Sequence, residues 1–154
     1  LHEASTAAFR AYAARVVENA RALAEALHGY GYRLVSGGTD THLMLVDLRT
    51  TDLSGKDASG LLGRAGITVN KNTVPFETRS PFVTSGIRIG TPALTTRGMG
   101  PDEMRWIAER MDRALRSGGD EGVLERVRSE VGELTSSFPL VAEPSTFLDR
   151  VAST

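Results

Sequence analysis

The run Ile87-Arg88-Ile89 places an arginine where it could bind a ligand. Alternate side chains of a strand point to opposite faces, so both isoleucines would be buried and Arg88 would face the other way. The planar guanidinium group of arginine can donate two parallel, charge-assisted hydrogen bonds to one carboxylate. The pattern therefore predicts either a carboxylate-binding residue or a surface arginine on a short strand, and the local sequence leaves both open.

An irregular stretch, residues 70–84, comes directly before this strand. Pro75 and Pro81 disfavour regular structure there, because proline lacks a backbone N–H group. A loop of this length in a compact domain is uncommon and often functional. We expect its apolar side chains to anchor it by packing, namely Val74, Phe76, Phe82 and Val83.

The elements that must position these residues follow from apolar periodicity and from breaker residues. Helices are expected at residues 6–28, 56–65, 92–96, 101–116 and 120–134, strands at 32–36, 42–48 and 84–90, and a brief extended piece at 67–69. Thr91 and Asp120 are expected to cap the helices that follow them. The predicted fold is α/β of the two-layer α+β type. It has a small, three-stranded, mainly antiparallel sheet, helices packed on one face, and a long N-terminal helix before it.

Length and composition narrow the class of protein. A chain of 154 residues predicts one domain, 1–154, with a core at about 6–142 and a fraying tail at 143–154. A net charge of −1 gives no basic excess for nucleic acid, and no apolar run suits a membrane span. The absence of cysteine excludes disulfides and fits a cytoplasmic protein. The first residues lack a signal-peptide pattern and a methionine, so we expect the chain to begin within a longer protein.

Several blocks of the sequence resemble the C-terminal part of serine hydroxymethyltransferase, a pyridoxal-phosphate and folate enzyme. The blocks occur in the family's order and near its spacing, densely over 34–98 and more weakly over 9–33 and 99–142. They are residues 35–40, 46–48, 66–72, 80–93 and 96–98. Several long blocks in order are far more specific than one short motif.

The resemblance implies roles for individual residues. Arg88 matches the family arginine that holds the carboxylate of the amino-acid substrate. The residues that match the folate loop are Asn72, Ser80, Pro81 and Phe82. An asparagine offers a donor and an acceptor to the edge of a heterocycle, although Asn72 could equally bond its own loop.

The resemblance also implies a parent enzyme. That enzyme interconverts serine and glycine and passes the one-carbon unit to tetrahydrofolate, as a cytoplasmic homodimer or higher oligomer. An upstream large domain would bind most of the pyridoxal phosphate. No residue here matches the Schiff-base lysine, so the isolated chain is expected to be inactive, with no catalytic residue of its own. Lys71 is expected to face solvent or to support the loop.

Two other functions remain open from the sequence. One is a stand-alone amino-acid-binding or regulatory module, and the other is the C-terminal domain of a related aminotransferase. The folate-like residues count against the aminotransferase, which needs no folate. His42 is expected to be structural, because the three histidines lack metal-ligand spacing, and residues 37–40 are expected to form a turn rather than a phosphate loop.

Overall fold

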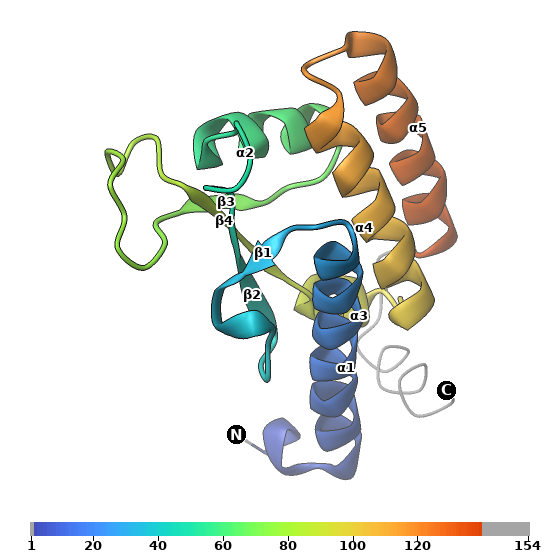
Figure 1. Ribbon diagram of the computed structural model, residues 1–154. Helices are drawn as coiled ribbons and strands as arrows, with labels where there is room; N and C mark the ends of the chain where they lie inside the picture. The colour runs from blue at the N-terminus through green and yellow to red at the C-terminus, as the bar shows by residue number, and fades with distance from the viewer. Residues whose placement is uncertain (1, 140–154) are drawn as a thin grey trace.

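The computed structural model describes residues 2–139, which contain five α-helices and four short strands (Figure 1). The tail predicted at 143–154 and the end of the predicted core, 140–142, lie outside the described residues. The helices are α1 (Ala7–Gly29), α2 (Gly55–Arg64), α3 (Pro92–Thr96), α4 (Pro101–Arg116) and α5 (Glu121–Ser137); the strands are β1 (Arg33–Leu34), β2 (Leu43–Asp47), β3 (Asn70–Asn72) and β4 (Gly86–Gly90).

The sheet has the order β1-β2-β4-β3, and every neighbouring pair is antiparallel. The predicted α+β class, the helices on one face and the long first helix are confirmed. The strand count is corrected from three to four, because β3 forms within the first residues of the predicted loop. Its register pairs Asn70 with Arg88 and Asn72 with Gly86. The predicted extended piece at 67–69 lies just before this strand.

One face of the sheet carries the core. Met44 and Val46 of β2 and Ile87 and Ile89 of β4 are buried there. The helices bring their own buried side chains to the same core, including Leu23, Leu27, Leu62, Met104 and Met111. Burying one such side chain contributes about 1.5–3 kcal/mol, so this layer holds the sheet in place. Figure 1 shows α1 and α4 side by side on the covered side.

Buried polar contacts fix the end of β4 against α1. The Nδ2 group of Asn19 donates to Thr95 Oγ1 and to the Met99 carbonyl oxygen, each at 2.9 Å. Thr91 Oγ1 donates to the Val16 carbonyl oxygen at 2.8 Å. Thr91 is the N-cap residue of α3, as predicted, but its side chain makes no capping hydrogen bond, because its hydroxyl binds α1. The cap predicted at Asp120 is confirmed by its bond from the Val123 N–H group at 2.9 Å.

Candidate functional site

The face of the sheet away from the helices bears Arg88 and Asn72, two of the residues singled out from the sequence. Ile87 and Ile89 are 0% and 9% exposed, whereas Arg88 between them is exposed. The alternation read from the sequence is therefore confirmed. Since Asn70 pairs with Arg88 and Asn72 lies two residues further along β3, all three side chains share this face.

Arg88 lines a shallow pocket of about 420 Å³ at the edge of this face. The other lining residues come from the start of β2, the start of β3 and the end of β4, and they are His42, Leu43, Thr68, Val69, Asn70, Ile89 and Gly90. Within residues 2–139, no hydrogen bond or ion pair engages the Arg88 guanidinium group. Its five N–H donors are thus available to a ligand carboxylate.

His42 is predicted to be structural, and its backbone fits that role. Its carbonyl oxygen accepts from the Thr91 N–H group at 3.0 Å, which ties the start of β2 to the end of β4. Its side chain, however, is exposed and lines the Arg88 pocket. The sequence analysis missed this proximity, because only the antiparallel pairing of β2 with β4 brings the two residues together.

Asn72 is half-buried on β3, opposite Gly86. Its Nδ2 group donates to the Thr73 carbonyl oxygen at 2.8 Å, so one donor serves the loop. Two residues along a strand span about 6.6 Å, so Asn72 lies within a small ligand's length of Arg88. Of the residues predicted to bind folate, Asn72 therefore lies on the same face of the sheet as Arg88.

The loop of residues 73–85 is organised around the carboxylate of Glu77. Its Oε1 atom accepts from the N–H groups of Thr78 and Arg79 at 3.0 and 2.9 Å, and from Ser85 Oγ at 2.7 Å. Its Oε2 atom accepts from the N–H groups of Val74 and Ser85 at 3.3 and 2.8 Å. These bonds, led by the one from Ser85 Oγ, lower the pKa of Glu77 to about 2.

Basic side chains fasten the same loop at its backbone carbonyl groups. Lys71 is exposed and its ammonium group donates to the Phe82 carbonyl oxygen at 2.8 Å, as its predicted supporting role requires. Arg79 donates to the Leu53 carbonyl oxygen at 3.1 Å. Ser80 Oγ accepts from the Phe82 N–H group at 3.2 Å, so Ser80 and Phe82 belong to one turn.

The predicted packing of the loop is wrong for two of its four apolar residues. Val74 is 5% exposed, whereas Phe76 and Phe82 are 92% and 80% exposed. Hydrogen bonds to Glu77 and Lys71 hold the backbone instead, so the rings are not needed as anchors. Pro81 and Phe82, both predicted to bind folate, are thus presented to solvent.

Asp47 is a buried acid that the sequence analysis missed. Its side chain is 1% exposed, and Arg49 donates to its two carboxylate oxygens, with a 2.7 Å bond to Oδ2. Arg33 lies 3.5 Å from Oδ2. The hydrogen bonds from Arg49 hold the pKa of Asp47 below its ordinary value. The only sequence signal is a lone acid at the end of an apolar strand, two residues before an arginine.

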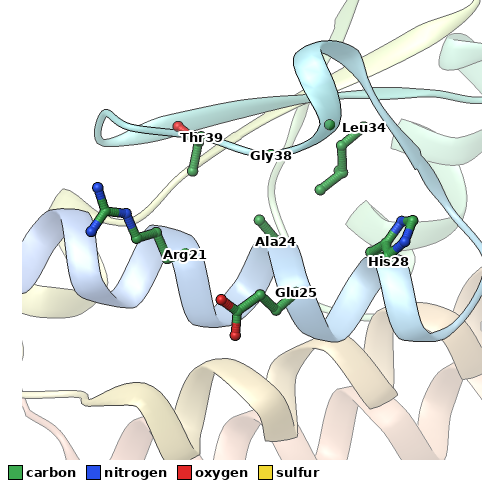
Figure 2. Close-up of a pocket in the computed structure, with 8 residues that line it drawn as sticks. Arg21, Ala24, Glu25, His28, Leu34, Gly38 and Thr39 are labelled. Carbon is green, nitrogen blue, oxygen red and sulfur yellow. The ribbon is translucent and has the colours of Figure 1, made fainter.

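A second pocket, of about 270 Å³, lies between α1 and the turn after β1 (Figure 2). Arg21, Glu25 and His28 line it from the helix, and Gly38 and Thr39 line it from the turn. Thr39 Oγ1 donates to the Leu43 carbonyl oxygen at 2.6 Å, which fits the turn predicted at 37–40. Across residues 2–139 there is no cluster of three potential metal ligands, and no helix there is long and apolar enough to cross a membrane.

The comparison with protein families identifies the class of protein to which this fold and surface belong. A family model described as serine hydroxymethyltransferase matches residues 1–111, which include the whole sheet, the 73–85 loop and Arg88. The chain belongs to the serine hydroxymethyltransferase family. Enzymes of this family are pyridoxal-phosphate-dependent transferases of one-carbon metabolism that act on serine and glycine.

The described residues do not fit a site for the pyridoxal-phosphate aldehyde. The chain has two lysines, Lys56 and Lys71. Both are exposed, and the amino group of Lys71 is engaged by the Phe82 carbonyl oxygen. A Schiff-base lysine is activated in a pocket shielded from water, which neither exposed position offers. We therefore derive no step through the cofactor on these residues.

Proposed function

We propose that residues 1–154 form the C-terminal small domain of a serine hydroxymethyltransferase, as a single domain that faces both the amino acid and the folate. The intact enzyme interconverts serine and glycine and transfers the one-carbon unit to tetrahydrofolate. The observation that carries this proposal is the Arg88 guanidinium group, which has no partner within residues 2–139 and lies in a pocket on the sheet face.

Arg88 would bind and orient the substrate carboxylate. The strand fixes the arginine backbone, and the planar fork of the side chain fixes the orientation of the carboxylate that it binds. Holding a substrate in its reactive geometry can lower the barrier by several kcal/mol. Pyridoxal phosphate, bound mainly by an upstream large domain, supplies the electron sink. The contribution of this chain is therefore the orientation of the substrate.

The folate would lie beside the amino acid on the same face. Asn72 keeps its Oδ1 atom free of hydrogen bonds within the described residues and can accept one from a heterocycle. Ser80, Pro81 and Phe82 present a turn whose aromatic ring is 80% exposed. Phe76 is exposed on the same loop, and both rings would contact the ligand or the upstream domain.

An amino-acid-binding module without catalysis is the second candidate. This candidate is favoured because both lysines are exposed and neither suits a Schiff base, while Arg88 could still bind the carboxylate of an amino acid. An aminotransferase would use Arg88 in the same way but gives Asn72 and the loop no role. The isolated chain is inactive under either candidate, so only the intact protein distinguishes them.

The test is turnover of the intact protein with serine, measured with and without tetrahydrofolate. The proposal expects glycine formation that depends on tetrahydrofolate, and none from residues 1–154 alone. Folate-independent exchange of amino groups with a keto acid would identify an aminotransferase. Binding of glycine without any turnover would identify the module.

A further inference from the structure

The Glu77 carboxylate is the hydrogen-bond acceptor around which the 73–85 loop is organised. Five hydrogen bonds converge on its two oxygens, from donors at both ends of the loop. Val74 stands near the start of the loop and Ser85 at its end, so one side chain closes the whole segment. An ionised carboxylate is an acceptor only, which matches five donors without any competing N–H or O–H group.

The bonds to Glu77 also lie next to two strained backbone positions of the loop. Phe76 directly precedes Glu77 and has a backbone φ of 59°, a left-handed conformation that is costly for a bulky residue. Thr84, directly before Ser85, has a φ of 61°. Such conformations persist only where surrounding contacts enforce them, and here Glu77 follows Phe76 while its carboxylate binds Ser85, which follows Thr84.

We propose that Glu77 is a positioning residue for folate binding: it preorganises the 73–85 loop so that the turn of Ser80 to Phe82 is in place before the ligand arrives. Glu77 acts through the loop and does not itself contact the folate. This inference rests on the proposed folate role of the loop. A preorganised loop binds more tightly because the cost of ordering it is met in folding rather than in binding.

The variant Glu77→Gln tests this in the intact enzyme, because it keeps the size of the side chain and places an NH₂ donor among N–H donors. Loss of bonds to a charged acceptor predicts a rise of about tenfold in the KM for tetrahydrofolate. The KM for serine should change by less than about twofold, as for substitutions away from a site. Glu133→Gln is the matched control, since Glu133 is exposed on α5 and its side chain accepts no hydrogen bond within residues 2–139.

Amide hydrogen exchange in the ligand-free enzyme measures the preorganisation directly. Exchange at Val74, Thr78, Arg79 and Ser85 should accelerate in Glu77→Gln and stay unchanged in Glu133→Gln. If Glu77→Gln does not fold, Ser85→Ala removes one of the five bonds and should give the same pattern at smaller amplitude. Unchanged exchange in the folded variants would overturn the positioning role.

A third variant separates this inference from the proposed function. Suppose that amide exchange accelerates in Glu77→Gln, that Asn72→Ala weakens folate binding, and that Glu77→Gln leaves folate binding unchanged. The loop then binds folate without needing Glu77, and the inference fails while the proposed function stands. If neither Asn72→Ala nor Glu77→Gln affects the KM for tetrahydrofolate, the folate role of the loop fails and the inference fails with it.

Discussion

The Arg88 pocket and the 73–85 loop both adjoin strands β3 and β4, but they use their charged side chains in opposite ways. Glu77 in the loop accepts five hydrogen bonds, and Lys71 and Arg79 are engaged by backbone carbonyl groups. The Arg88 guanidinium group has no hydrogen bond or ion pair with any residue in the described range 2–139. The loop therefore uses its charges for folding, whereas Arg88 keeps its charge for a ligand. Variants of the loop charges should therefore disturb the loop structure and change folate binding only through it, whereas variants of Arg88 should change carboxylate binding directly.

The largest stability effect is expected where the loop end rests on α2. The N–H groups of Gly55 and Lys56 donate to the Thr84 and Val83 carbonyl oxygens at 3.0 Å each. A Cβ atom at Gly55 would collide with Thr84 Oγ1 and with the Gly86 carbonyl oxygen. Gly55→Ala should therefore lower the free energy of unfolding by about 3 kcal/mol, measured by urea denaturation.

Gly60 in the same helix is the matched control for Gly55. A Cβ atom at Gly60 would meet no atom outside its own helical turn within 4 Å, and the φ of Gly60 is not positive. Gly60→Ala should stabilise the protein by about 0.5–1 kcal/mol through helix propensity. Equal effects of the two alanines would show that α2 and the loop are not coupled.

A smaller loss of stability is expected from the buried acid at the end of β2. Asp47→Asn removes the ion pair with Arg49 and should cost about 2 kcal/mol, because Arg49 is partly exposed and can recruit water. Asp102→Asn is the control and should cost about 0.5 kcal/mol or less, since its pair with Arg105 is largely exposed.

The Asp47 contribution has a defined pH dependence. Its pKa in the folded protein lies below the ordinary value of 3.8, so its stabilisation is fully present above that value. It is lost as the pH falls through the lowered pKa. The stability difference between wild type and Asp47→Asn should therefore shrink in acid, and a difference that grew below pH 3.8 would contradict the ion pair.

A binding effect with little change in stability is expected at Asn72. In the intact enzyme, Asn72→Ala should raise the KM for tetrahydrofolate by the equivalent of about 1–2 kcal/mol and spare glycine binding. Calorimetric titration with each ligand would measure the two affinities separately. Equal losses for both ligands would mean that Asn72 only supports its own loop, through its bond to the Thr73 carbonyl oxygen.

The part of the candidate site that contains Arg88 could be predicted from the sequence, because it depends only on strand alternation. Ile87, Arg88 and Ile89 predict a strand with one exposed arginine, because strand periodicity follows from backbone geometry alone. The strand Asn70–Asn72 is missed, since three polar residues at a sheet edge carry no apolar alternation. Its pairing with β4 is a long-range contact that no local pattern contains.

The structure of the loop could not be predicted from its apolar residues. Val74 packs as expected, but Phe76 and Phe82 do not. Hydrogen bonds to the Glu77 carboxylate hold the loop, which was expected to be held by apolar packing. Asp47 illustrates the same difficulty. Its burial depends on Arg33 and Arg49 meeting it across β1 and the turn after β2.

The most direct test of the account is the affinity of Arg88→Lys for glycine in the intact enzyme. Lysine keeps the charge but lacks the planar fork, so the dissociation constant should rise by the equivalent of at least about 1.5 kcal/mol. Serine turnover should fall further, because small displacements there can cost about 100-fold. The melting temperature should not change, and Arg126→Lys, an exposed arginine on α5, should leave both ligand measurements unchanged. Normal glycine affinity and serine turnover in Arg88→Lys would contradict the assignment of Arg88 to the carboxylate site.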